Sequence, residues 1–217
     1  MPRTTSLIAL AVSGVAFQAV LLSQTKPTAA TYITDEEVKT VNATPGVDRT
    51  IRVVDIGNEH FAVGVIHRVG AARGAAGAAR GTTARGGPSV PVPVPCGDQV
   101  TPPATGATPG GISHDSQTEG YVIVSGSGTL VTGGHIVNGT RSAPDSAVTR
   151  ELNGPSCSGA IAGADVVRRV VKTGDIIIIP AGVPHGWTDI GDHVDYLSLR
   201  PSGQALEAGY VHPALRK

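Results

Sequence analysis

Short runs of β-branched and aliphatic residues, separated by turn residues, recur along most of the chain. Two clear runs are 50–56 (TIRVVDI) and 61–69 (FAVGVIHRV), with the turn sequence GNEH at 57–60 between them. Runs of this length bounded by Gly, Pro, Asn and Asp are typical of β-strands. Further short strands are predicted at 121–124, 129–132, 166–171, 175–179 and 193–199. Because no helices alternate with them, the pattern predicts an all-β sandwich or jelly-roll barrel.

One short helix is predicted ahead of the strands, at 33–41 (ITDEEVKTV). Thr34 and Glu37 have the spacing of a capping box, in which each side chain accepts a hydrogen bond from the other residue's backbone. No convincing helical periodicity follows Val41. Residues 138–165 are therefore predicted to be a long irregular connection.

Residues 70–111 differ in composition from the strands on either side. A Gly/Ala/Arg-rich stretch is followed by PSVPVPVP and TPPATGATPGG. Such sequences bury too little apolar surface to offset the entropy lost on ordering, so we predict a mostly disordered insertion. The alternative is a functional arm in which Arg68, Arg73, Arg80 and Arg85 contact an acidic partner.

Residues 1–30 have the character of an export signal. Arg3 precedes a mostly apolar run at 6–22, and the small residues Thr28-Ala29-Ala30 follow as a cleavage site. A retained membrane anchor is the alternative, although the run is short for a spanning helix and contains polar residues. A cleaved signal implies a secreted or periplasmic protein without stable membrane insertion.

Export also bears on the two cysteines, Cys96 and Cys157, because disulfides persist in oxidising compartments. We predict a disulfide that tethers two loop segments, with two free thiols as the alternative. The chain carries 17 basic and 17 acidic residues. This balance leaves no net positive field to attract nucleic acid.

Two segments carry the candidate chemistry. The first is GATPGGISHDSQTEGYVIVSG (106–126), which contains His114 and Glu119, and the second is GDIIIIPAGVPHGWTD (174–189), which contains His185. In residue type and spacing, the two segments resemble the two motifs of the cupin family. The first two ligands in the first motif of that family are the histidines of a His-x-His sequence. This chain has Ile112 in place of the first of these histidines. The second motif ends in Asn, where this chain has Asp189.

The resemblance covers about 50–200, apart from the insertion, and implies a single all-β cupin barrel. The remaining parts are then the signal at 1–30, an N-terminal extension at 31–49 with its short helix, and a C-terminal tail at 201–217. Cupins commonly form dimers, so the resemblance also implies a homodimer.

By the same resemblance, His114, Glu119 and His185 bind one divalent transition metal ion inside the barrel. Two imidazoles and a carboxylate suit Fe(II) or Mn(II), which we favour, and also Zn, Ni or Cu. Positions left open on the ion suit water, substrate or dioxygen. His114 and Glu119 differ in strand parity, so a turn or bulge near 117–118 must bring Glu119 inward. A metal-free alternative makes Glu119 the buried partner of an arginine.

A substrate pocket is predicted around these ligands, lined by Ile112, Tyr121, Ile123, Trp187 and His67. The favoured function is a metal-dependent, dioxygenase-like oxidoreductase acting on a small molecule, with an isomerase or decarboxylase as close variants. The alternative is a non-catalytic cupin that binds a small molecule or sugar. With no helix-turn-helix and no basic patch, a nucleic-acid-binding role is disfavoured.

Overall fold

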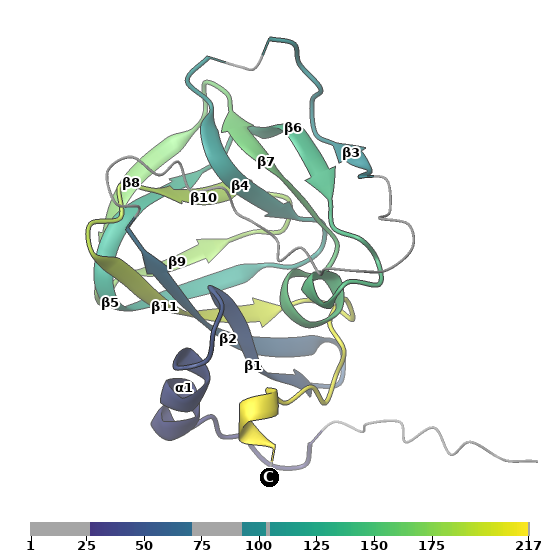
Figure 1. Cartoon of the computed structure of the whole chain (residues 1–217). Coiled ribbons are helices and arrows are strands. Elements are labelled where there is room, and N and C mark those ends of the chain that lie inside the picture. The colour runs from purple at the N-terminus through teal and green to yellow at the C-terminus, as the bar shows by residue number, and fades with distance from the viewer. Residues whose placement is uncertain (1–26, 71–92, 103–104, 217) are drawn as a thin grey trace, which may run out of the picture.

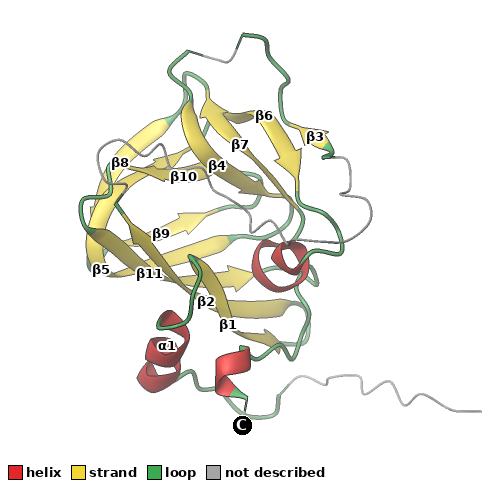
Figure 2. Cartoon of the chain, viewed as in Figure 1, coloured by secondary structure: helices red, strands yellow, loops and turns green. Residues whose placement is uncertain are grey.

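The structure is a computed structural model that describes residues 27–70, 93–102 and 105–216. Its elements are shown in Figure 1 and coloured by type in Figure 2. In chain order they are α1 (Asp35–Asn42), β1 (Asp48–Asp55), β2 (His60–Val69), β3 (Pro95–Cys96), β4 (Thr108–His114), β5 (Glu119–Thr132), β6 (His135–Arg141), the π-helix η1 (Val148–Asn153), β7 (Ser156–Ala162), β8 (Val167–Lys172), β9 (Ile176–Ile179), β10 (His185–Thr188), β11 (His193–Pro201) and the 3-10 helix η2 (Pro213–Leu215).

The strands form two antiparallel sheets that share β5. One sheet has the order β1-β2-β11-β5-β9 and the other β8-β5-β10-β4-β7-β6-β3. Strands distant in sequence lie side by side, as where β11 pairs with β2. This arrangement is a double-stranded β-helix barrel with a short N-terminal helix (Figure 1). The predicted fold class is confirmed.

Strand β5 bends to pass from one sheet to the other at Gly126. Up to this residue β5 pairs with β11, and from Ser127 onward it pairs with β8. Gly126 has φ of +70°, and a Cβ atom there would lie 2.0 Å from the carbonyl oxygen of His193. Only glycine fits such a close approach at positive φ. Two separate strands were predicted at 121–124 and 129–132, which is wrong: the glycine bends one strand and does not end it.

Helix α1 packs outside the barrel against β1 and β2. The side chain of Thr34 accepts a hydrogen bond from the backbone of Glu37 at 3.2 Å, and the carboxylate of Glu37 accepts one from Thr34 at 3.1 Å. This capping box confirms the predicted helix start. Val41 buries its side chain against Ile51 and Val65, together with Leu215 of η2. The helix and the C-terminal turn therefore cover the outer side of these two strands.

The prediction of a long irregular connection at 138–165 is wrong, and the predicted insertion at 70–111 includes the start of a strand. Residues 138–165 contain the end of β6, the helix η1 and all of β7, and β4 begins at Thr108, inside the predicted insertion. The predicted signal and the Gly/Ala/Arg-rich stretch lie almost entirely at 1–26 and 71–92, outside the described residues. A disulfide joins Cys96 of β3 to Cys157 of β7.

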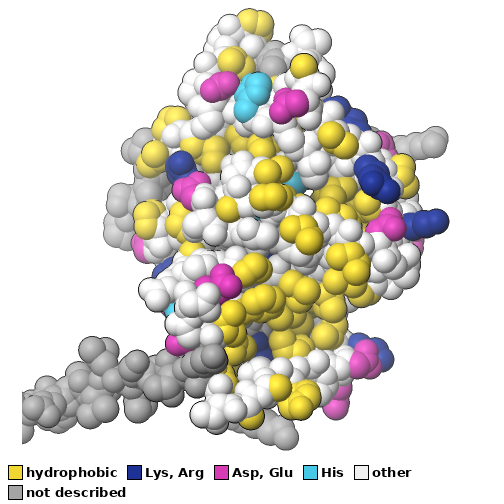
Figure 3. Space-filling view, turned by 180° about the vertical axis from the view of Figure 1, so that it is seen from behind, with side chains coloured by type: hydrophobic (Ala, Val, Ile, Leu, Met, Phe, Trp, Pro, Cys, Tyr) yellow, Lys and Arg dark blue, Asp and Glu magenta, His cyan; other side chains and the backbone are white. Residues whose placement is uncertain are grey.

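Hydrophobic side chains also gather on the surface, as the view from behind shows (Figure 3). Ile176 and Ile178 of β9 are 71% and 74% exposed, and Val170 of β8 is 71% exposed. Strand β9 lies at the edge of its sheet, with β5 as its partner. Within the described ranges, no helix has the length and apolar character needed to cross a membrane.

Candidate metal centre

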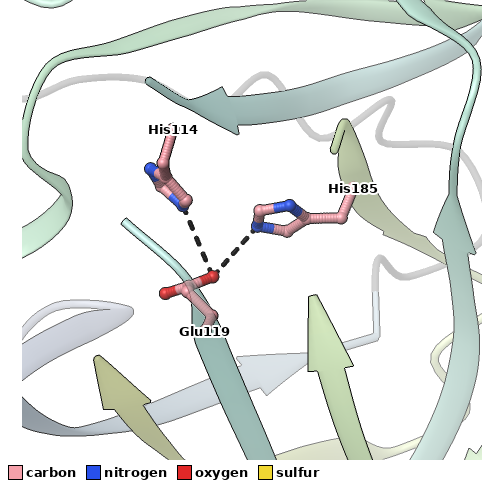
Figure 4. A group of neighbouring side chains, drawn as sticks. All are labelled: His114, Glu119 and His185. Carbon is pink, nitrogen blue, oxygen red and sulfur yellow. Dashed lines mark ion pairs between the residues drawn. The ribbon is translucent and has the colours of Figure 1, made fainter. Parts of the chain in front are cut away.

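Three side chains converge inside the barrel from the ends of three strands. His114 is the last residue of β4, Glu119 the first of β5 and His185 the first of β10 (Figure 4). Oε2 of Glu119 lies 3.4 Å from Nε2 of His114 and 3.0 Å from Nε2 of His185. The three residues are only 2–3% exposed. Their ligand-type atoms all lie within 4.8 Å of one another, a spacing that one metal ion can bridge.

A turn between β9 and β10 aligns the two histidines. The backbone N–H of Gly182 donates a hydrogen bond of 2.7 Å to the carbonyl oxygen of His114, and Val183 N–H donates to the carbonyl of Pro180 at 3.1 Å. The turn is thereby fastened to the end of β4, and His185 follows directly on the next strand. Glu119 reaches the same point because residues 115–118 form a loop, after which β5 starts in its own orientation.

The hydrogen bond at Nδ1 of His185 defines which of its nitrogens can act as a ligand. Nδ1 lies 3.1 Å from the carbonyl oxygen of Val183, which can only accept, so Nδ1 carries the hydrogen. In the neutral ring, Nε2 then directs a lone pair at a carboxylate oxygen 3.0 Å away. That contact is repulsive unless a cation or a proton lies between the two atoms. Metal-binding histidines characteristically donate their other N–H to a carbonyl or carboxylate in this way.

The donor set and its spacing fit a divalent transition metal. Ions bound by imidazole and carboxylate lie about 2.0–2.2 Å from each ligand atom. Neighbouring ligand atoms are then about 3 Å apart, as the two Glu119–histidine distances are. Nδ1 of His114 is buried and has no hydrogen-bond partner among the described residues. His114 therefore lacks the orienting contact that His185 has.

The second oxygen of Glu119 belongs to a buried ion-pair network. Oε1 accepts hydrogen bonds from Nε of Arg200 at 2.9 Å and from the hydroxyl of Ser198 at 3.1 Å. Arg200 also donates to Oδ2 of Asp48 at 2.7 Å. Burial by itself raises the pKa of Glu119, but the charge of Arg200 and the contacts with the two histidine rings outweigh it and hold that pKa well below the usual range. The arginine partner considered as an alternative to metal is therefore present, but it uses the other oxygen.

Tyr121 completes the contacts of the carboxylate. Its hydroxyl donates to Oε2 of Glu119 at 2.6 Å. Burial, together with the negative charge of Glu119, raises the pKa of this phenol well above its ordinary value. The side chain is therefore a neutral hydrogen-bond donor at neutral pH.

The other predicted pocket residues lie in different places. Ile112 is paired in register with His185 across β4 and β10, beside the three ligands. Tyr121 and Ile123 belong to the buried core, against which Trp187 packs. His67 does not face this interior: it pairs with Asp195 on the outer side of the sheet, where its side chain is 41% exposed.

Arg68, considered as part of a functional arm, belongs to the barrel. It lies on β2, and its Nε donates to the hydroxyl of Tyr196 at 3.0 Å. Tyr196 is 1% exposed and stacks on Trp187, with ring centroids 5.3 Å apart. The remaining arginines of that alternative, at 73, 80 and 85, lie outside the described residues.

Asp189, which stands where the cupin motif has Asn, suits the backbone conformation at this position. Asp189 has φ of +49°, in the left-handed region that Asn and Asp tolerate better than other residues with a Cβ. Both Asn and Asp can therefore occupy this turn after β10.

The sequence motifs did not single out Arg200, Ser198 or Asp48. Arg200 and Ser198 lie on the same face of β11 as Tyr196, because the three occupy every second position, and all three are buried. The sequence feature that could have indicated Arg200 is its spacing, since it has the same parity as the inward-facing residues of the strand. It lay just beyond the predicted strand, which ended at Leu199.

Fold and site together define the class: a double-stranded β-helix barrel with a buried His–Glu–His group able to hold a metal ion. No protein-family model matches the chain, and no curated protein matches it in sequence.

Among solved structures, the chain is similar to a conserved protein with a double-stranded β-helix domain from Klebsiella pneumoniae. The two are 17% identical, with a TM-score of 0.37 over 82% of this chain and 93% of that chain. An oxalate oxidase in complex with glycolate is 13% identical, with a TM-score of 0.32 over 75% of this chain and 55% of that chain. Hydroquinone 1,2-dioxygenase from Sphingomonas sp. TTNP3, with 4-hydroxybenzoate bound, is 12% identical, with a TM-score of 0.32 over 87% and 90%. At such TM-scores these likenesses carry no argument about function.

Proposed function

We propose that the chain binds one divalent transition metal ion through His114, Glu119 and His185 and acts on a small molecule as a dioxygenase-like oxidoreductase. The observation that carries the metal site is the convergence of the three buried ligand atoms, with Nε2 of His185 3.0 Å from Oε2 of Glu119. Fe(II) and Mn(II) suit two imidazoles and one carboxylate, and both support redox chemistry. Zn, Ni and Cu fit the same donor atoms.

The chain's own residues would set the coordination and the surroundings of the reaction. A bound ion supplies Lewis acidity and, when redox-active, electron transfer. The two imidazoles and Oε2 of Glu119 would leave further coordination positions free for substrate and dioxygen. Ile112 offers an apolar surface beside His185, which favours an apolar or aromatic edge on the substrate. Tyr121 would hold Oε2 of Glu119 in place through its hydroxyl.

Oxygen uptake tests this proposal. The full chain is loaded with Fe(II) or Mn(II), and oxygen consumption is recorded against a panel of small aromatic and thiol compounds. We expect turnover that is lost in His185→Ala and kept in His135→Ala, because His135 is an exposed residue of β6. Metal-loaded protein without turnover on any compound would contradict the oxidoreductase role. Loss of turnover in both variants would contradict the assigned site.

A non-catalytic binding role is the second candidate, and the burial of the three side chains at 2–3% exposure favours it. Such a protein would hold an ion or a small ligand without converting it. A rise in melting temperature with added ligand, together with unchanged ligand after prolonged incubation, would distinguish it from the enzyme. An isomerase or decarboxylase would instead convert its substrate without consuming oxygen.

We also propose that the protein works in the periplasm or outside the cell. The Cys96–Cys157 disulfide supports this location, because structural disulfides are rare in reducing compartments. Fractionation of cells that express the full chain, with N-terminal sequencing of the mature protein, tests it. Recovery of the intact chain from the cytoplasm would contradict the proposal.

A further inference from the structure

We infer that Arg200 is a positioning residue of the proposed metal centre, holding Glu119 so that one carboxylate oxygen alone, Oε2, faces the ion. The inference rests on the proposed function, since it concerns the same site. Arg200 does not face the ion itself, because its contact with Glu119 is made to Oε1.

The guanidinium of Arg200 is fixed by contacts to several parts of the fold. The residue is 1% exposed, and its Nε donates to Oε1 of Glu119 at 2.9 Å and to Ser198 Oγ at 2.8 Å. Its two terminal nitrogens donate to the carbonyl oxygen of Leu152 in η1 at 2.9 Å and to Oδ2 of Asp48 in β1 at 2.7 Å. A planar group held from several directions has little freedom to rotate. It therefore presents Nε to Glu119 in a defined direction.

The two oxygens of Glu119 consequently have different partners. Oε1 accepts hydrogen bonds from Arg200 and Ser198, whereas Oε2 accepts one from Tyr121 and faces the two histidines. Coordination through both oxygens would require Oε1 to give up its bonds to Arg200 and Ser198. Because those donors are buried, leaving them unpaired costs free energy. Glu119 is thereby restricted to one coordination position, and another remains open on the ion.

Charge explains why an arginine is used here. Arg200 lies between two carboxylates, Glu119 and Asp48, and so balances part of their buried negative charge. A lysine at 200 would keep the positive charge. It could not reproduce the planar set of contacts to Glu119, Leu152 and Asp48.

Mn(II) binding by calorimetry tests this role with two variants. Arg200→Lys keeps the charge but loses the geometry, and we expect Mn(II) to bind about 10–100-fold more weakly, as is typical when a partner of a metal ligand is removed. Ser198→Ala removes one donor to Oε1 and leaves both ion pairs, so a smaller loss is expected. Arg52→Lys, in the half-buried pair with Glu37, is the matched control and should bind as wild type does.

A spectroscopic measurement separates positioning from general loss of structure. Cu(II) bound to Arg200→Lys should give an EPR spectrum shifted from that of wild type, because Glu119 gains freedom to use both oxygens. Urea unfolding shows whether each variant is folded, and Ser198→Ala decides the matter if Arg200→Lys does not fold. Wild-type Mn(II) affinity in every folded variant, with an unchanged Cu(II) spectrum, overturns the inference alone. A wild-type chain that binds no Mn(II) overturns the proposed function and this inference with it.

Discussion

Nδ1 of His185 lies 3.1 Å from the carbonyl oxygen of Val183, within the turn whose Gly182 N–H is bonded to the carbonyl of His114. One turn therefore fixes both the position of the second histidine relative to the first and the nitrogen it presents. Backbone contacts of this kind do not depend on an ion. The site is accordingly preorganised for metal by the main chain of the second motif.

A histidine introduced at position 112 should strengthen metal binding. Ile112 is in register with His185 and two residues before His114 on β4, so it shares the inward face of that strand. A third imidazole there would add a fourth ligand, and we expect Ile112→His to tighten Mn(II) binding by about 10-fold or more, or about 1.4 kcal/mol. Ser113→His, on the opposite face of β4, is the control. Equal affinities for the two variants and wild type would show that position 112 does not face the ion.

Replacing Glu119 by glutamine should destabilise the metal-free protein. The change leaves the buried Arg200 with Asp48 as its one charged partner among the described residues, and breaking a buried ion pair from one side typically costs about 3–5 kcal/mol. Urea unfolding in the presence of a chelator measures the loss. Glu37→Gln, in the half-buried pair with Arg52, should cost about 1 kcal/mol or less. A Glu119→Gln variant as stable as wild type would show that the buried network contributes nothing to the fold.

As the pH falls, the free energy of unfolding of the metal-free wild type should decrease more than that of the Glu119→Gln variant. Burial raises the pKa of Glu119, but Arg200 and the two histidines lower it by a larger amount. The pKa of Glu119 in the folded protein therefore lies well below the ordinary value of 4.5. The stabilisation is fully present above that value and is lost as the pH falls toward the folded pKa. The free energy of unfolding, measured by urea from pH 7 to pH 3, should therefore fall more steeply for wild type below about pH 4.5. Parallel curves would contradict the lowered pKa.

Reduction of the Cys96–Cys157 disulfide should lower stability by about 2–4 kcal/mol. The bond joins β3 to β7 across 61 residues of chain, and opening it frees the unfolded state. Urea unfolding with and without a reductant measures the difference. The chain has no other cysteines, so a variant with both replaced by alanine should not respond to the reductant. A wild-type midpoint that is unchanged by reduction would mean that the bond does not constrain the chain.

Much of the barrel was predictable from hydrophobic patterning. The runs at 50–56, 61–69, 166–171, 175–179 and 193–199 correspond to β1, β2, β8, β9 and β11 within one or two residues at most ends. Strand β7 (SCSGAIA) was missed because small residues give it no strand-like pattern. A Cβ atom on its Gly159 would lie 2.8 Å from the Cα of Gly139 on β6. The glycines of these two strands therefore reflect close packing, which sequence alone presents as a loop.

The candidate site was predictable only in part. The spacing of two motifs singled out His114, Glu119 and His185, which the structure brings together. Arg200 could not be paired with them, because its contacts depend on the registers of β1, β2 and β11. Its partner Asp48 lies 152 residues away along the chain. His67 was misplaced for the same reason: its orientation depends on its pairing with Asp195.

The most direct test of the metal centre is the metal-to-protein ratio after equilibrium dialysis against Mn(II), measured by elemental analysis for wild type and for His114→Ala, Glu119→Gln and His185→Ala. We expect about one ion per wild-type chain and far less than one in each variant. A wild-type ratio near zero, or a ratio of one retained in His185→Ala, would contradict it.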